Sequence, residues 1–336
     1  MAKKRTYANQ KGGVTKTTTV VQDMIQSRLL GKRALLVDTD PQGNATYALG
    51  YHPDTLKHTV YTVMLGQSSL NDALLHTYFD PQTGTYFDPR NTRRMQELGI
   101  TSLEQARRGP DLLPNNILAA TAETDLQSHP SWGTVLRDIL EDIDALYDDI
   151  GIDTNPSLGK MTVSAFCAAD YAIIPLVPET LPSQGMIQLC KTFVEARKYN
   201  RKLRMAGVLF TRVRYSSHEE TIRDIRGPVL QHLNTRQDLP DLNLSCFEAT
   251  IPENALFEKA IKDRTSIILA NSISAPAIAY WQFYTELMKS IDGLGYEKAQ
   301  QMYLQLQKGF QKQQEEEKAK KRRGRTVKPS IESKGE

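Results

Sequence analysis

The sequence contains little cysteine and no long apolar run. Its three cysteines, Cys167, Cys190 and Cys246, are far apart and form no Cys-x-x-Cys pair. Zinc and iron–sulfur sites built on such pairs are therefore excluded, and we expect buried, reduced thiols. No run of about 18 apolar residues occurs, and the first residues carry charge without an apolar signal segment. These absences predict a cytoplasmic protein that does not span a membrane.

The chain also lacks a strong overall charge, since its formal net charge is only +3 over 336 residues. The charge is concentrated instead near the end, where residues 318–328 include seven basic side chains and no acidic one. Such a run is typical of a solvated tail that contacts nucleic acid or an anionic surface, or of a tail that only aids solubility. Gly293 and Gly295 mark a boundary. We expect a domain over 1–292, then a polar helix and a disordered basic tail over 293–336.

Short apolar runs alternate with segments of helical periodicity along most of the chain. The expected helices include 17–30, 132–146 and 273–291, and the expected strands are 34–37, 111–113, 149–152, 171–177 and 205–210. This alternation predicts an α/β fold in which a mostly parallel, twisted sheet carries helices on both faces.

Two segments depart from this pattern. Residues 77–109 are polar and contain the string TYFDP at both 77–81 and 85–89, which predicts a surface insertion with a hairpin or paired turns. The expected first strand, Arg5 to Ala8, is less apolar than a central parallel strand should be. We interpret this as a sign of weakened nucleotide binding, or of a partner that covers that edge.

A candidate phosphate-binding loop, Lys11-Gly12-Gly13-Val14-Thr15-Lys16-Thr17, precedes the first expected helix. Glycines let the backbone approach an anion, and the N–H groups at a helix N-terminus attract negative charge. Lys16 is placed to reach the β- and γ-phosphates, and the Thr17 hydroxyl to bind Mg²⁺. The strict Walker A pattern nevertheless fails, because Asn9 and Thr15 stand where it requires glycine.

Three carboxylates follow expected strands, and they strengthen the case for this loop. Asp38 and Asp40 come directly after the run 34–37, and Asp153 follows 149–152. Ligands of open α/β sheets bind at the carboxyl ends of the strands. We therefore predict that Asp38 and Asp153, with Thr17, hold magnesium, in part through water.

The strings KGGVTKTTT, DTDPQGNAT, DTNPSLG, AADYAIIPLVPE and ATIPENALFEKA resemble the ParA/Soj family of partition ATPases over roughly residues 5–290. The resemblance implies that ATP and Mg²⁺ are the ligands and that ATP binding forms a homodimer. It implies that Lys11 reaches the partner's nucleotide, that Gly12 lets two loops approach, and that Asp40 positions the attacking water. Nucleotide contacts would come from Lys11, Gly12, Gly13, Val14, Thr15, Lys16, Thr17 and Thr18, and, for adenine, from Pro252 and Asn254, with Tyr215, Ser216 and Ser217 nearby.

The same resemblance implies that the dimer binds DNA nonspecifically, is nucleoid-associated, and is released when a ParB-like partner stimulates hydrolysis. Basic residues near the composite face of the dimer would contact the DNA phosphates. The candidates are Arg212, Arg214, Arg223, Arg226, Lys259, Lys262 and Arg264, with the basic tail in addition.

Position 15 is where this sequence departs most from the family, which usually has glycine or alanine there. We expect Thr15 to adopt an ordinary negative φ, because a β-branched residue is costly at positive φ. Two other functions remain open. One is a membrane-positioning ATPase of the MinD type, although residues 325–336 form no amphipathic helix and 296–310 is a weaker candidate. The other is a noncatalytic regulator that binds ATP without turnover.

Overall fold

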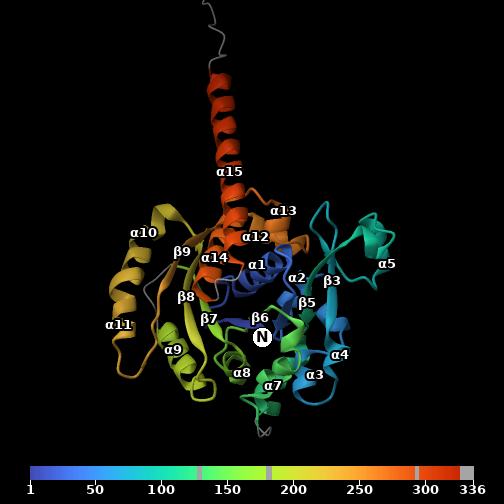
Figure 1. The fold of residues 1–336 in the computed structure, drawn as a ribbon, viewed down its shortest axis with the longest axis vertical. Coiled ribbons are helices and arrows are strands. Elements are labelled where there is room, and N and C mark those ends of the chain that lie inside the picture. Colours follow the sequence, from blue (N-terminus) through green and yellow to red (C-terminus); the bar gives the residue numbers. More distant parts are fainter. Residues whose placement is uncertain (127–130, 179–183, 292–294, 326–336) are drawn as a thin grey trace, which may run out of the picture.

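The computed structural model describes residues 1–126, 131–178, 184–291 and 295–325. Within them, nine strands form one sheet in the order β4-β3-β5-β2-β6-β1-β7-β8-β9 (Figure 1). Neighbours from β5 to β9 pair in parallel, whereas β3 is antiparallel to both β4 and β5. The strands are β1 Lys3–Tyr7, β2 Ala34–Asp38, β3 Leu75–Phe79, β4 Tyr86–Phe87, β5 Arg107–Leu113, β6 Asp149–Asp153, β7 Tyr171–Leu176, β8 Arg204–Val213 and β9 Cys246–Pro252. The predicted α/β class is confirmed.

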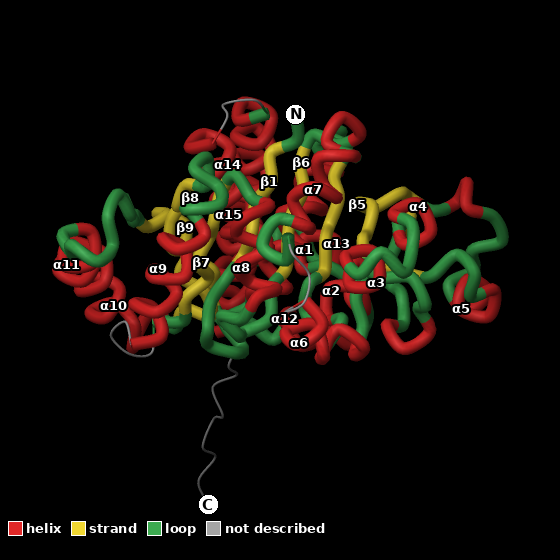
Figure 2. Tube along the Cα trace, turned by 90° about the horizontal axis from the view of Figure 1, so that it is seen from below, coloured by secondary structure: helices red, strands yellow, loops and turns green. Residues whose placement is uncertain are grey.

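Helices cover both faces of the sheet, and each face has its own apolar core (Figures 1 and 2). One face is covered by α1 Lys16–Leu29, α2 Asn44–Ala48, α12 Leu256–Lys262, α13 Ile267–Ala270, α14 Ala275–Ile291 and α15 Tyr296–Arg325. The other is covered by α3 Val60–Met64, α4 Leu70–Ala73, α6 Ala122–Asp125, α7 Val135–Asp142, α8 Lys160–Ala168, α9 Gln184–Ala196, α10 Tyr215–Asp224 and α11 Leu230–Asn234. A further short helix, α5 Thr92–Glu97, lies at the periphery.

The expected elements are found with small shifts at their ends. The helix expected over 132–146 is α7 followed by a 3₁₀ turn at Asp144–Leu146. The helix expected over 273–291 begins at Ala275, and Pro276 fits its first turn, where the missing N–H costs nothing. Cys167 and Cys190 are buried, Cys246 is partly buried, and all three are free thiols.

The polar first strand has an explanation inside the chain, so the interpretation of an edge covered by a partner is wrong. β1 lies in the centre of the sheet between β6 and β7. Arg5 is fully buried, and its guanidinium donates to Asp149 of β6 and to Asp23 of α1. Tyr7 also donates to Asp23. The strand can be polar because charged partners on β6 and α1 compensate it.

Residues 77–109 are not only a surface insertion. The predicted hairpin is present, with Tyr78 opposite Phe87 and Phe79 opposite Tyr86. These strands extend the sheet beyond β5, and Phe79, Tyr86 and Phe87 are buried. The apolar residues of the TYFDP strings therefore build core, while α5 at the tip of the insertion has no buried residue.

The last described helix, α15, packs on α14 at its start and then projects away from the body (Figure 1). Residues 326–336, which include the end of the basic run, lie outside the described residues, as do the side chains of 318–325. None of the described helices combines the length and the apolar character that a membrane crossing requires.

Candidate active site

The predicted site residues meet at the carboxyl ends of three adjacent strands. In the register of the sheet, Tyr7 at the end of β1 pairs with Asp153 at the end of β6, and Asp153 pairs with Asp38 at the end of β2. The predicted phosphate loop connects β1 to α1 and therefore lies directly beside both carboxylates. Residues distant in the sequence thus form one site, as the strand-end argument predicted.

The loop is held by hydrogen bonds from side chains of neighbouring strands. Asn9, which replaces a glycine of the strict pattern, donates from Nδ2 to the carbonyl of Pro175 in β7 at 2.7 Å. Its Oδ1 accepts from the N–H of Lys11 at 3.0 Å. Thr211 of β8 donates from its hydroxyl to the carbonyl of Val14 at 3.1 Å. The two hydrogen bonds of Asn9 therefore hold the loop in its conformation. A glycine at this position would allow the same conformation but could not stabilise it with a side chain.

Thr15 does not have the ordinary backbone geometry that we expected. It is the N-cap of α1 with φ 63° and ψ 27°, in the left-handed region. The chain must turn there to direct it into α1, whose first intrahelical bond joins Thr19 N–H to the Thr15 carbonyl at 2.9 Å. A β-branched residue in this conformation is strained, by about 1–3 kcal/mol. The surrounding loop contacts impose the geometry despite its cost.

Lys16 lies under the loop rather than in solvent. Its side chain is almost buried, and Nζ donates to the carbonyl of Lys11 at 3.3 Å. Burial lowers the pKa of Lys16, while the nearby carboxylates of Asp153 and Asp40 raise it again. The ammonium therefore lies between the loop and two carboxylates. From this position its hydrogen bond to the Lys11 carbonyl can be replaced by one to a bound anion. By contrast, Lys11 and Gly12 are exposed, and apart from the chain neighbours of Gly12 no atom of the described residues lies within 4 Å of where a Gly12 Cβ would be.

The acids differ in how they are held. Asp38 is fully buried and accepts from the Thr46 N–H at 2.9 Å and from the Thr46 hydroxyl at 2.8 Å. Burial nevertheless raises the pKa of Asp38 to about 7. Burial and the charge of Asp38 raise the pKa of Asp153 well above its usual range, although Thr17 lies close enough to oppose this. Asp40 accepts from the Gln42 N–H at 2.9 Å and is nearly buried.

These residues fit a hydrated magnesium ion better than a directly ligated metal. Neither carboxylate oxygen of Asp153 has a hydrogen-bond partner of good geometry among the described residues. Within the same part of the chain, no three His, Cys, Asp or Glu side chains converge closely enough to hold a metal. Mg²⁺ in phosphate sites usually keeps several waters and takes one or two protein oxygens. The unpartnered oxygens of Asp153 and the Thr17 hydroxyl suit that role.

The predicted adenine segment lies at the end of β9, three positions from β1 in the sheet. Pro252 is the last residue of β9, and Asn254 accepts from the Leu256 N–H at 3.0 Å through Oδ1. Glu253 between them binds two arginines, Arg212 and Arg214, which lower its pKa to about 2. The side chains of residues 215 and 216 are outside the described set, and Ser217 is exposed on α10.

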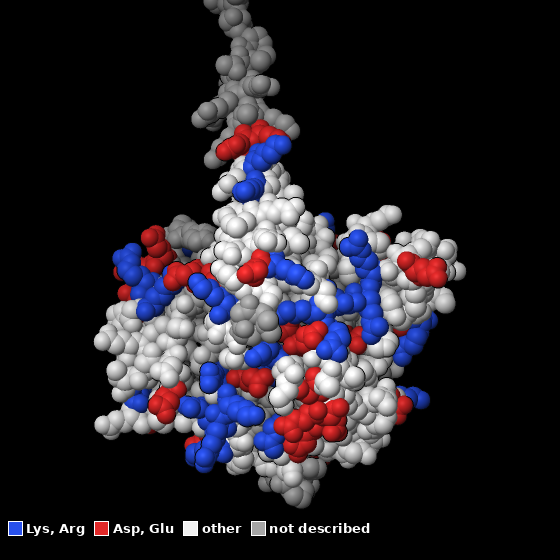
Figure 3. Space-filling view, viewed as in Figure 1, with Lys and Arg blue, Asp and Glu red and all other residues white. Residues whose placement is uncertain are grey.

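The structure separates the candidate DNA-binding residues into two groups. The first group lies along β8 and α10 and contacts acidic side chains throughout: Arg212 is on β8, Arg214 between β8 and α10, Arg223 on α10 and Arg226 just after it. The other group, on and after α12, is Lys259, Lys262 and Arg264. On the face in Figure 3, basic and acidic side chains are interspersed, so no broad basic field covers it.

The second group borders a basic groove that the sequence did not reveal. A cavity of about 400 Å³ is lined by Lys262 and Arg264 and, from the insertion, by Asn91, Arg93, Arg94 and Glu97. Arg264 also lies over the ring of Tyr47, 4.2 Å from its centroid. The arginines of the insertion were visible in the sequence, but their proximity to α12 depends on the tertiary fold.

Asn115 is a site-edge residue that the sequence reasoning missed. It is fully buried beyond the end of β5, beside β2, and its N–H donates to the Thr46 hydroxyl at 3.1 Å. Its side-chain amide has no partner among the described residues. The strand-end rule that pointed to Asp38 and Asp153 also applies here, since Asn115 comes two residues after the expected strand 111–113.

Known proteins are similar to this chain over the part that contains the site residues. A family model described as "AAA domain" matches residues 2–86 and 90–205. The chromosome partitioning protein ParA of Myxococcus xanthus is 31% identical over 285 residues, covering 84% of this chain and 86% of that protein. The sporulation initiation inhibitor protein Soj of Bacillus subtilis is 34% identical over 212 residues, covering 63% and 73%.

Among solved structures, cobyrinic acid a,c-diamide synthase from Mycobacterium smegmatis with bound ATP analog and magnesium is similar, with a TM-score of 0.64 and 30% identity. The match covers 87% of this chain and 97% of that chain. The ranges matched by the family model include Lys16, Asp38 and Asp153, the residues that the fold brings together.

Proposed function

Because the chain belongs to the ParA/Soj family of ATPases, within the MinD/ParA superfamily, we propose that it is a DNA-partition ATPase that binds Mg-ATP at the site just described. As a member of this family the protein is an ATPase. The proposal adds the steps that follow nucleotide binding: dimerisation, nonspecific DNA binding, and release on hydrolysis stimulated by a ParB-like partner.

The observation that carries the proposal is the position of Lys16. Its ammonium lies beneath a loop that opens into a helix N-terminus, and it is close to Asp40 and Asp153. A buried lysine that is satisfied only by a backbone carbonyl and nearby acids can bind a phosphate oxygen. The helix N-terminus adds N–H donors to the same anion.

The other residues of the site then have distinct tasks. Thr17 and Asp153 hold magnesium, with Asp38 behind them, and the ion neutralises charge on the phosphates when it is bound. Asp40 lies nearly buried at the same strand ends, with its oxygens available to orient a water molecule. Pro252 and Asn254 border the base.

Exposed residues of the loop would form the dimer contact, and exposed basic residues of the groove would bind DNA. Lys11 and Gly12 are exposed on the outer side of the loop, so a second subunit can approach them closely. DNA phosphates would contact the basic groove of Lys262, Arg264 and the insertion, because it offers several cations against one acid. We expect the protein to be associated with the nucleoid for the same reason.

The decisive experiment is an ATPase assay of the full chain, alone, with nonspecific duplex DNA, and with DNA plus the product of the adjacent reading frame. We expect weak basal turnover and stimulation by both additions together. Asp40→Ala should abolish the stimulated rate while leaving ATP binding measurable. Glu104→Ala, an exposed acid far from the strand ends, is the control and should behave as the parent.

Two other results would replace the proposal. Binding to anionic vesicles without binding to DNA would favour a MinD-like positioning ATPase. ATP binding without turnover, with or without DNA and partner, would leave a regulator that acts through the bound state.

A further inference from the structure

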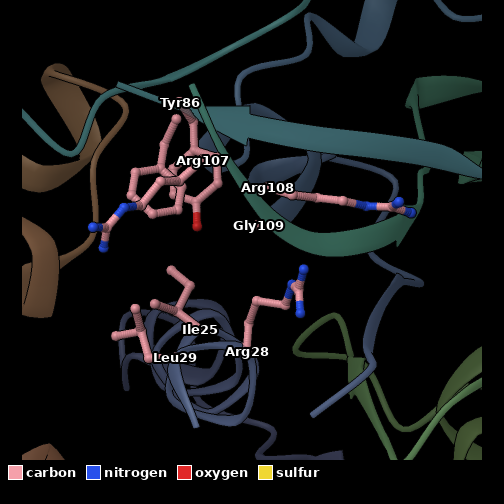
Figure 4. A pocket seen from close by; sticks show the side chains of 8 residues that line it. Ile25, Arg28, Leu29, Tyr86, Arg107, Arg108 and Gly109 are labelled. Atoms are coloured by element: carbon pink, nitrogen blue, oxygen red, sulfur yellow. The ribbon is translucent and has the colours of Figure 1, made fainter. Parts of the chain in front are cut away.

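A second cavity, lined by both polar and apolar side chains, lies at the opposite end of α1 from the phosphate loop, between that helix and the antiparallel edge of the sheet (Figure 4). Its volume is about 280 Å³. Tyr86 of β4, Phe79 of β3 and Arg107 of β5 are direct cross-strand neighbours, so they share one face of the sheet. Ile25 and Arg28, from the last turns of α1, face them across the cavity.

The hydroxyl of Tyr86 is the feature that most needs a partner. The side chain is 1% exposed, and the hydroxyl makes no hydrogen bond to any described residue. Burial raises the pKa of Tyr86, so the group is a neutral donor. Figure 4 shows it pointing into the cavity. Gly109 makes room for it, since a Cβ there would lie 2.6 Å from the Tyr86 ring and 3.0 Å from its oxygen.

Two arginines at the cavity also lack counter-charges. Arg28 and Arg107 form no ion pair with any residue in the described part of the chain, whereas Arg108 beside them donates to Asp111 at 2.8 Å. A guanidinium is always charged and presents a planar fork of donors that matches phosphate and carboxylate groups. Ile25 and Phe79 provide an apolar wall between these donors.

We propose that this cavity is a second ligand site, which binds a small organic phosphate. The phosphate oxygens accept from the Tyr86 hydroxyl and from Arg28 and Arg107, and the planar or apolar part of the ligand lies against Phe79 and Ile25. A buried polar donor is normally partnered in a folded protein, and this ligand supplies the missing acceptor. The site is separate from the nucleotide site, and its existence does not depend on the function proposed above.

The test is calorimetric titration of the full chain with phenyl phosphate while the nucleotide site is saturated with ADP and Mg²⁺. We expect saturable binding that weakens about tenfold in Tyr86→Phe, which keeps the ring and removes only the hydroxyl, and at least as much in Arg28→Gln. Arg201→Gln is the matched control, because Arg201 is exposed on a turn distant from the cavity. This variant should bind phenyl phosphate with the same affinity as the parent.

Several outcomes would overturn the proposal. One is the absence of saturable heat up to about 10 mM phenyl phosphate. Another is equal affinity of the parent, Tyr86→Phe and Arg28→Gln, which would place the binding elsewhere. Inorganic phosphate that binds as tightly as phenyl phosphate would refute the role of the apolar wall. Arg28 is partly exposed, so its variant remains informative even if Tyr86→Phe lowers the Tm.

Discussion

Arg5 and Asp149 form an ion pair in the middle of the sheet, with Nη1 and Oδ1 2.8 Å apart and both side chains fully buried. Asp23 of α1 completes the arrangement by binding Nε of the same guanidinium at 2.8 Å. α1 starts at the phosphate loop, so this buried group fixes the helix that carries Lys16 to the strands that carry the acids. The pair is therefore a structural support of the proposed nucleotide site.

Arg5→Leu should lower the free energy of unfolding by about 3–5 kcal/mol, because buried Asp23 loses its cation and buried Asp149 keeps only Lys32. Chemical denaturation at pH 7 measures this. Arg33→Leu is the control: Arg33 pairs with Asp148 at 2.8 Å on the surface, and its loss should cost far less. An equal decrease in the free energy of unfolding of the two variants would show that the buried ion pair of Arg5 stabilises the fold no more than the surface pair of Arg33.

The Arg5→Leu effect should also depend on pH in a defined direction. In the parent, burial tends to raise the pKa of Asp149, but Arg5 and Lys32 more than offset this and lower it. Burial already raises the pKa of Asp23 in the parent, where Arg5 opposes it. Without Arg5 the pKa of both carboxyls rises, and the folded state then favours their protonation more strongly. The destabilisation should therefore be greatest near neutral pH and shrink as the pH falls toward the ordinary aspartate pKa of about 3.9. A difference that stays constant from pH 7 to 4 would contradict this account.

Thr15 supplies a second stability prediction. Thr15→Gly should raise the free energy of unfolding of the nucleotide-free protein by about 1 kcal/mol, because glycine adopts φ 63° without steric cost. Thr18→Gly, the same change within α1, should instead lower it by about 1 kcal/mol. Thermal unfolding of the three proteins gives the comparison. Destabilisation by both changes would mean that contacts of the Thr15 side chain outweigh its backbone strain.

The sequence predicted those parts of the site that depend on local pattern. The proximity of Lys16, Asp38 and Asp153 could be predicted because a helix N-terminus and strand ends are recognisable in short stretches of sequence. The buried ion pair that stabilises β1 could not be predicted, since Arg5 and Asp149 are 144 positions apart. An arginine considered without its partners is expected to be exposed. The φ of Thr15 was predicted wrongly because loop contacts override the preference of a β-branched residue. The Tyr86 cavity was missed because it depends on the register of β3, β4 and β5.

The two loop lysines should behave differently when each is changed to alanine. Lys16→Ala should weaken ADP and ATP binding by about 100-fold or more, because the buried ammonium has no substitute at the phosphates. Lys11→Ala should spare much of the nucleotide affinity and abolish ATP-dependent dimerisation and DNA binding, because Lys11 is exposed on the outer side of the loop. Fluorescent-nucleotide titration and light scattering separate the two effects. A Lys11→Ala protein that dimerises like the parent would refute the contact across the dimer.

Glu253 offers a direct test of whether Arg212 and Arg214 bind DNA. Hydrogen bonds from Arg214 and Arg212 lower the pKa of Glu253 to about 2, so at neutral pH its single negative charge offsets one of the two positive charges and its oxygens engage both guanidinium groups. Glu253→Gln should remove this carboxylate from the two arginines, strengthen DNA binding several-fold at low salt, and steepen the slope of log Kobs against log salt by about 1.

Fluorescence anisotropy with a nonspecific duplex, over a series of salt concentrations and with ATP present, measures both quantities for Glu253→Gln. Glu195→Gln is the matched control, since Glu195 near the end of α9 forms an exposed ion pair with Lys198, away from both basic groups. The DNA affinity of this variant should equal that of the parent. If Glu253→Gln binds DNA no more tightly than the parent, Arg212 and Arg214 do not face the phosphates. DNA contact would then rest on the groove of Lys262 and Arg264, where Lys262→Gln should lower the affinity and make the salt slope shallower by about 1.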